Sequence, residues 1–280
     1  MSTRLVGYQP QYFPRLHYYA RILNADIFKI SDNLQYVRRH AYPSSDGTRH
    51  NGPSYQAHSP IKTSQGMYLL DVPTSHVLPQ RERMMNTVSL DYSKEWPRKH
   101  IRILELNYGR APFFKKLMPG ITALLNQPYE NLAACTIASM VWGLAVLFEF
   151  PVALFESVPA ELVAMFSHHG FRLKKIVRMS EEELHPADKT SGEDVNSWIV
   201  HQCRALGATE YYFGGTAGAA YLDLERIARS GITLVQQNWH CEEYPQQFPR
   251  HGFMPNLSIL DLLMNVSPAA ARAILATPNQ

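Results

Sequence analysis

Near its start the chain reads RLVGYQPQYFPRLHYYARILNADIFKI over residues 4–30, and this stretch decides the order of the first elements. Arg4 to Tyr8 and Asp26 to Ile30 are short apolar runs with β-branched residues, which is typical of strands. Tyr18 to Asn24, between them, is typical of the start of a short helix. A strand, a helix and a second strand in this order predict a βαβ unit, whose two strands run parallel.

The last third of the chain repeats this alternation. The spacing predicts a helix over Asp194 to Leu206 that ends at Gly207, and another over Ala219 to Ser230 that ends at Gly231. Apolar runs at Glu210 to Phe213 and at Ile232 to Gln236 predict two more strands. We therefore expect a Rossmann-like α/β fold, with an open, mostly parallel sheet covered by helices on both faces.

The middle of the chain is expected to interrupt this sheet. Residues 36–65 are rich in Pro, Ser, Gly, His and Arg without periodicity, which predicts a long irregular loop, and Gly66 to Pro73 is expected to form a strand. Residues 93–150 have helical spacing and are expected to form a helical insertion between an N-terminal α/β half, 1–92, and a C-terminal half, 151–280. The three parts are expected to form one compact domain.

One segment within the insertion raises the question of a membrane. Leu132 to Phe148 carries no charged residue, but it is shorter than a usual span and lacks flanking Lys or Arg clusters. A buried helix is the favoured interpretation, and contact with a membrane stays open. The N-terminus also lacks the apolar core of a secretory signal, and three isolated cysteines favour a reducing compartment, so we expect a cytoplasmic location.

The net charge and the distribution of basic residues limit the classes of ligand that we expect this protein to bind. The 280 residues carry a net charge of +3, and basic residues occur in runs no longer than a pair such as Arg38-Arg39. This pattern argues against a nucleic-acid surface but allows an anionic small substrate. His240-Cys241-Glu242-Glu243 does not predict a metal site, because adjacent residues of an extended strand point to opposite faces. No cofactor is assigned.

Short motifs along nearly the whole chain resemble those of the WbqC-like family. The leading ones are Gln9-Pro10-Gln11-Tyr12-Phe13-Pro14 after the first strand and Asp32-Asn33-Leu34-Gln35-Tyr36 after the second. Further pieces follow in the same order: Ile61-Lys62, Trp96, Lys99-His100, Tyr212-Phe213-Gly214-Gly215, Tyr221-Leu222, Tyr244-Pro245-Gln246 and Leu257 to Leu263. The chain departs from the family at Ala57-His58-Ser59-Pro60, where members carry an Asn-Arg pair, and at His17, where they tend to have Gly.

The resemblance implies a role in the biosynthesis of O-antigen and related surface polysaccharides. We expect a transferase-like enzyme that modifies an activated sugar or a similar small metabolite, with an acyl or aminoacyl group as the group transferred. The expected ligand is a nucleotide sugar or an acyl donor. Two alternatives stay open: a non-catalytic partner in a biosynthetic complex, and a nucleotide-binding enzyme related to nucleotidyltransferases with a His-x-Gly-His signature. In this chain Leu16 and Tyr19 would stand at the two histidine positions. A homo-oligomer is also possible.

Two residues are candidates for catalysis. Asp32 follows the second strand, and ligands of open parallel sheets bind at the carboxyl ends of strands, although an Asp also commonly caps a turn. His100 is a candidate general base, or else a histidine packed against Trp96 one helical turn earlier. Near the C-terminus, Ser258 and Asp261 resemble a capping box at the start of a helix.

Further residues are expected to bind substrate. Gln35 and Tyr36 add an amide and a phenol beside Asp32, and Gly214-Gly215 follow a strand where backbone N–H groups could approach an anion. The other candidates are Gln9, Tyr12, Lys62, Tyr221 and Gln246. The sequence thus predicts that the Asp32, Gln35 and Tyr36 side chains and the Gly214 turn meet at one edge of the sheet.

Overall fold

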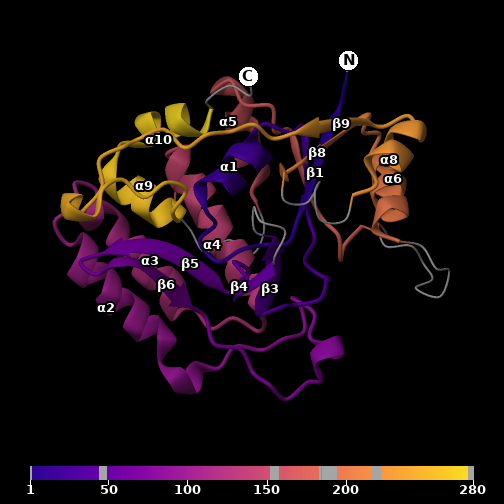
Figure 1. Cartoon of the computed structure of the whole chain (residues 1–280). Coiled ribbons are helices and arrows are strands. Elements are labelled where there is room, and N and C mark those ends of the chain that lie inside the picture. Colours follow the sequence, from indigo (N-terminus) through magenta and orange to yellow (C-terminus); the bar gives the residue numbers. More distant parts are fainter. Residues whose placement is uncertain are drawn as a thin grey trace.

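A computed structural model describes residues 2–43, 49–151, 158–182, 184, 194–215 and 222–276, with the backbone alone at 40–43 and 49–50. Its central feature is a sheet of five parallel strands in the order β7-β2-β1-β8-β9 (Figure 1). The strands are β1 (Arg4–Tyr8), β2 (Ile27–Ile30), β7 (Lys175–Arg178), β8 (Glu210–Phe213) and β9 (Thr233–Gln236). The predicted Rossmann-like α/β fold is confirmed. The alternation of strands and helices in the first and last thirds of the chain was the correct signal.

The strand order reverses direction at the middle of this sheet. From β1 the chain proceeds outward through β2 to β7 on one side, then returns and proceeds through β8 to β9 on the other. β1 pairs with β2 over four residues, but with β8 through only Arg4 with Glu210 and Leu5 with Tyr211. The carboxyl ends of β1 and β8 are therefore not paired with each other. Such a reversal point is where open α/β sheets bind ligands.

The two faces of the sheet are covered by different helices. On one face, Leu5, Ile27 and Val177 pack with α6 (Val195–Ala205) and α8 (Leu224–Arg229). On the other, Val6 and Phe28 belong to the larger core, with α1 (Leu16–Leu23). Figure 1 shows α6 and α8 on one side of the strands and α1 and α4 on the other. The four residues of β2 are buried on both faces, as expected for a parallel strand between two helical layers.

The larger core also takes in the helices of the middle and end of the chain. These are α2 (Trp96–Tyr108), α3 (Phe114–Asn126), α4 (Leu132–Leu147), α5 (Ala160–His168), α9 (Ile259–Asn265) and α10 (Pro268–Leu275). Helix α4, the uncharged segment, is buried along nearly its whole length, from Leu132 to Leu147. Across the described ranges, no helix has the length and apolar character needed to cross a bilayer.

The prediction of one irregular loop over 36–65 is wrong, because two hairpins occupy most of it. β3 (Arg39–Pro43) pairs antiparallel with β4 (Arg49–Pro53), and β5 (His58–Thr63) with β6 (Gly66–Asp71). All six residues of β5 are buried, so this strand lacks the alternation of apolar and polar residues that marks a half-exposed strand. Three short 3₁₀ turns complete the described elements: η1 (Gln80–Glu82), η2 (Tyr92–Lys94) and η3 (Pro249–His251).

Candidate functional site

A cavity of about 470 Å³ opens at the carboxyl ends of β1 and β8, where the strand order reverses. Its wall includes Tyr8 and Gln9 at the end of β1, and Phe213, Gly214 and Gly215 at the end of β8. Residues of α1 and α6 line it from the two faces of the sheet. Its size lies within the range of small-molecule and cofactor sites, roughly 300–1,000 Å³.

Three basic side chains line this cavity: Arg15, Arg21 and Lys29, which we call the cationic group. Arg21 and Lys29 are each 6% exposed. Among the described residues of the cavity wall, neither Asp nor Glu occurs. Buried cations without acidic neighbours attract an anionic ligand, because burial removes the water that would otherwise solvate them.

Arg21 is held at the boundary between α1 and the end of β8. Its Nε donates to Gln237 Oε1 at 2.7 Å, and its guanidinium lies 4.8 Å from the centre of the Tyr8 ring. A Cβ at Gly214 would lie 2.8 Å from Arg21 Cζ, so the missing side chain there lets the guanidinium approach the β8 backbone. The guanidinium and the Gly214 backbone thus lie side by side.

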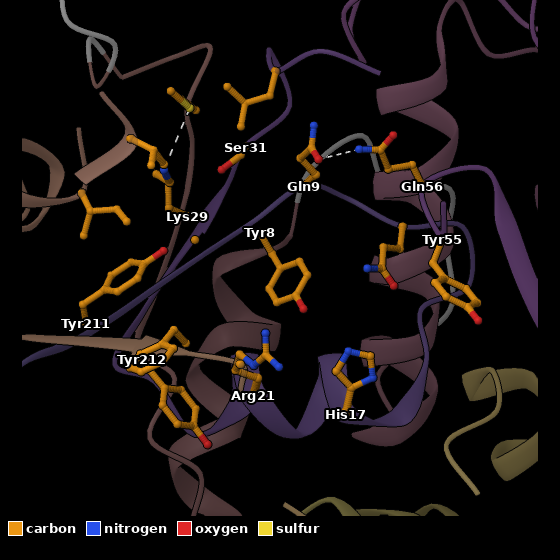
Figure 2. Close-up of a pocket in the computed structure, with 18 of the residues that line it drawn as sticks. Tyr8, Gln9, His17, Arg21, Lys29, Ser31, Tyr55, Gln56, Tyr211 and Tyr212 are labelled. Atoms are coloured by element: carbon orange, nitrogen blue, oxygen red, sulfur yellow. Dashed lines mark hydrogen bonds between the residues drawn. The ribbon is translucent and has the colours of Figure 1, made fainter. Parts of the chain in front are cut away.

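Lys29 reaches the cavity from the α6 face of the sheet. Its Nζ donates to Gln202 Oε1 at 2.5 Å and lies 4.0 Å from Met179 Sδ. Burial lowers the pKa of Lys29 to about 8. Figure 2 shows Lys29 beside Ser31 and Tyr211, with Arg21 and His17 along another wall and Tyr8 between.

Aromatic and amide groups complete the wall. Tyr8, Tyr55, Tyr211, Tyr212 and Trp198 line the cavity, and the Arg15 guanidinium lies 3.5 Å from the centre of the Tyr55 ring. These rings could stack on a planar group of a ligand.

One amide of the wall has no partner for its oxygen. Gln11 is 8% exposed, and its Oε1 accepts no hydrogen bond in the described part of the protein. Since buried polar atoms are nearly always bonded, this oxygen is an acceptor available to a ligand or to water.

His17 also lines the cavity and is held through Asn256. The Asn256 Oδ1 accepts from the His17 backbone N–H at 2.9 Å and lies 3.0 Å from the ring Nδ1. Burial, followed by the neighbouring Arg15 and Arg21, lowers the pKa of His17 well below its usual value. The ring is therefore neutral at pH 7 and adds no positive charge.

Of the residues selected from the sequence, Gln9, Gly214 and Gly215 lie together in the wall of the cavity. Asp32 follows β2 as expected but is completely buried. It accepts from Ser180 Oγ at 2.6 Å and pairs with Arg178 at 2.9 Å. Its carboxylate ties the end of β2 to the end of β7 and does not line the cavity.

Gln35 and Tyr36 lie beyond the rim rather than in the cavity wall. The exposed Gln35 donates from Nε2 to Gln80 O at 3.1 Å, and its backbone carbonyl accepts from Gln9 Nε2 at 3.0 Å. Tyr36 is 2% exposed. The Asp32, Gln35 and Tyr36 side chains therefore do not meet the Gly214 turn in the cavity wall, where Ser31 and Leu34 of the same segment lie instead.

The other catalytic candidate, His100, makes its contacts outside the wall of this cavity. It is 4% exposed, its Nδ1 lies 2.9 Å from the Tyr12 hydroxyl, and its ring packs edge-on against Trp96. Burial lowers the pKa of His100 to about 4. His100 lines a second cavity, of about 590 Å³, that shares no lining residue with the first. The contact with Trp96 that the sequence suggested is present.

Lys62 and Gln246 belong to a buried cluster around Asp261. The Asp261 carboxylate accepts from Tyr108 at 2.6 Å, from Tyr244 at 2.8 Å and from Gln246 at 3.1 Å. Lys62 Nζ donates to Gln246 Oε1 at 3.2 Å. We call these five residues the Asp261 cluster. The predicted capping box is half correct, since Ser258 caps α9 while Asp261 points into this cluster. Tyr221 lies outside the described residues.

Sequence reasoning missed the cationic group. Two signals could have found it: a lysine inside the strand Ile27-Phe-Lys-Ile30, and an arginine inside the mostly apolar helix Leu16–Leu23. Long charged side chains are seldom fully buried without a reason. Within the described parts of the chain, groups of three or more His, Cys, Asp or Glu that could hold a metal do not occur.

Comparison with known proteins places the chain in a family. It is 24% identical over 264 residues to the Uncharacterized protein Rv1507c of Mycobacterium tuberculosis, which covers 94% of this chain and 93% of that protein. No solved structure gives a significant match. The family model of the WbqC-like proteins matches residues 9–158 and 170–273, which include Gln9, both catalytic candidates and the whole cationic group. The chain is therefore a member of the WbqC-like protein family.

Proposed function

We propose that the protein binds a phosphorylated small metabolite, such as a nucleotide-linked sugar, in the cavity between β1 and β8, and modifies it as a transferase. The observation that carries this proposal is the cationic group. Arg21 and Lys29 are nearly buried, and neither has an acidic neighbour in the described wall of the cavity. A diphosphate would supply the missing negative charge and accept hydrogen bonds from a guanidinium.

The rest of the wall suits the other parts of such a ligand. Tyrosine rings and Trp198 offer flat surfaces for a base or a sugar ring. The Gln11 Oε1 and the Gln9 and Gln56 amides offer acceptors and donors for hydroxyl groups. A cavity of this composition favours an anionic, ring-containing metabolite over a lipid or a neutral apolar compound.

For the reaction, we propose transfer of an acyl or aminoacyl group to an amino or hydroxyl group of this metabolite. The support is the polysaccharide-building role that the family resemblance implies. A nucleotidyltransferase-like activity is the second candidate, because the same cationic group would equally bind the phosphates of ATP or CTP.

Isothermal titration calorimetry at low salt tests the binding. UDP-N-acetylglucosamine, ATP, inorganic pyrophosphate and free N-acetylglucosamine are titrated into the wild-type protein. We expect binding of at least one diphosphate compound and none of the free sugar. Arg21→Gln is expected to weaken that binding at least about tenfold, since a hydrogen bond to a charged group contributes about 1.5–3 kcal/mol.

A matched control separates the cavity from general charge effects. Arg102→Gln removes an equal charge from α2, where the side chain is 67% exposed and pairs with Glu105 outside the cavity. The proposal fails if no diphosphate compound binds, or if the two arginine variants weaken binding equally. Magnesium-dependent binding of ATP alone, without the nucleotide sugar, would favour the nucleotidyltransferase-like alternative.

A further inference from the structure

Lys29 reaches the cavity only because a glycine stands beside it. Its strand, β2, pairs with β1 so that Lys29 lies opposite Gly7. A Cβ on Gly7 would lie 2.8 Å from Lys29 Cε and 3.2 Å from Nζ, so any other residue there would displace the chain of the lysine. With glycine at position 7, the amine passes across β1 and ends at the cavity wall.

The partners of the amine are few and neutral. Lys29 Nζ donates to Gln202 Oε1, and Gln202 is fixed by its own Nε2, which donates to Leu184 O at 3.3 Å. Within the part of the chain that the structure describes, Nζ also lies near the Met179 sulfur, and no carboxylate is within ion-pair distance of it. Cys203, on the same helix as Gln202, is also buried, and burial raises the pKa of its thiol.

This environment raises the fraction of uncharged lysine near neutral pH. With a pKa of about 8, roughly a tenth of Lys29 is free amine at pH 7, against roughly one part in a few thousand for a solvated lysine. A desolvated lysine in such a site is the usual form of a nucleophilic amine. A residue that only filled this space would be better served by Met or Leu, which need no solvation.

We propose that Lys29 is a nucleophile, and that its amine captures an aldehyde or ketone carbon of the phosphorylated metabolite, whose phosphate binds at Arg21. The amine lone pair forms a bond to the carbonyl carbon, and the carbon–oxygen double-bond pair moves to oxygen, which takes up a proton. The resulting carbinolamine loses its oxygen as water, together with the proton remaining on nitrogen, and an imine remains. The inference rests on the proposed function for the phosphate and adds a carbonyl group to the ligand.

Reductive labelling of the full-length protein tests this. The protein is incubated at pH 7 with pyridoxal 5′-phosphate or with pyridoxal, which share the aldehyde but differ in the phosphate. Borohydride then reduces each imine to a stable amine, and peptide mass spectrometry compares Lys29 with the exposed Lys94 and Lys175. We expect both reagents to label Lys29 at least tenfold faster than the exposed lysines, and the ratio of Lys29 to Lys94 labelling to be higher with the phosphorylated reagent. This ratio cancels the lower reactivity of pyridoxal, which closes to an internal hemiacetal.

The outcomes separate this inference from the proposed function. Labelling of Lys29 by either reagent no faster than Lys94 overturns the inference, while the proposed function stands if calorimetry detects diphosphate binding. An equal ratio of Lys29 to Lys94 labelling with the two reagents keeps the nucleophile but overturns the phosphate site. Arg21→Gln is expected to remove the advantage of the phosphate without removing labelling by pyridoxal. Because the decisive comparison uses the wild-type protein, it does not depend on whether a Lys29 variant folds.

Discussion

The Asp261 cluster and the cationic group both bury charged or polar side chains, but they differ in how those side chains are satisfied. In the cluster, Asp261 accepts three hydrogen bonds from Tyr108, Tyr244 and Gln246, and Gln246 in turn accepts from Lys62. In the cavity, Arg21 and Lys29 each donate to a neutral amide oxygen, and no described acidic residue lines the wall. The polar groups of the Asp261 cluster thus have their partners within the protein, whereas the charges of Arg21 and Lys29 have no counter-charge in the described wall of the cavity.

This difference separates structural from ligand-binding polar residues. A fully satisfied buried network fixes the relative positions of its elements, here β5, α2 and α9. Buried cations without counter-charges reduce stability until something anionic binds. Both the Asp261 cluster and the wall of the cavity contain residues from the motifs that resemble the family. A motif residue can therefore serve the fold or the ligand, and the hydrogen-bond partners distinguish the two roles.

The largest effect is expected from breaking the Asp261 cluster. Asp261→Ala leaves two tyrosine hydroxyls and the Gln246 amide without their acceptor, and should lower the free energy of unfolding by about 3–5 kcal/mol. Urea denaturation followed by circular dichroism measures this. Glu105→Ala, which removes an exposed carboxylate on α2, is expected to cost less than about 1 kcal/mol. Similar losses for the two variants would contradict a structural role for the cluster.

A second, smaller effect should appear on acidification. The pKa of His100 is about 4 in the folded protein but near 6.5 when unfolded, so between these values the unfolded chain binds a proton that the folded chain does not. Stability should therefore fall as the pH drops from 6.5 towards 4, by about 2–3 kcal/mol for this residue.

The contribution of His100 to the loss of stability at low pH is measured with the variant His100→Gln. His17, whose pKa is also lowered, contributes in the same direction, so the difference between wild type and variant isolates His100. Urea midpoints at a series of pH values should depend less on pH in the variant. An identical pH dependence would mean that His100 is protonated without penalty in the folded protein.

The smallest expected effect is a gain in stability, and it concerns Lys29 in the cavity. Lys29→Met keeps a similar chain but removes the buried amine, and should raise the free energy of unfolding at pH 7 by about 1–2 kcal/mol, after the lost bond to Gln202 is deducted. The gain should shrink above pH 8, because the unfolded wild-type chain keeps the proton that the folded chain has released. Thermal unfolding at pH 7 and pH 9.5 measures both. A variant less stable than wild type at pH 7 would place Lys29 with the structural residues.

Much of the sheet could be predicted from the sequence. The bounds of β1 and β8 agree with the apolar runs Arg4 to Tyr8 and Glu210 to Phe213, and glycines with positive φ follow α6 and α8 at Gly207 and Gly231. β7 was missed because its four residues, Lys175-Ile-Val-Arg178, have a charged residue at each end. Short strands of this kind are specified by their neighbours in the sheet rather than by their own sequence.

The site was predictable only in part. Of the residues expected to bind substrate, Gln9, Gly214 and Gly215 line the cavity, and their binding role stays a prediction. The rule that ligands bind at strand ends selected Asp32, but its partner Arg178 comes from β7, which the sequence analysis did not identify, so the ion pair could not be anticipated. Arg21 and Lys29 lie inside a helix and a strand, where periodicity assigns residues to the core. Their approach to one cavity depends on the strand order.

The contact between Gly7 and Lys29 has a consequence for comparing sequences. Because a side chain at position 7 would displace the end of the lysine, we expect the two positions to vary together in related chains. Gly7 and Lys29 are 22 residues apart and face each other across neighbouring strands. Under this proposal, related chains that carry both residues are able to react with a carbonyl compound, and chains that lack them only bind their ligand.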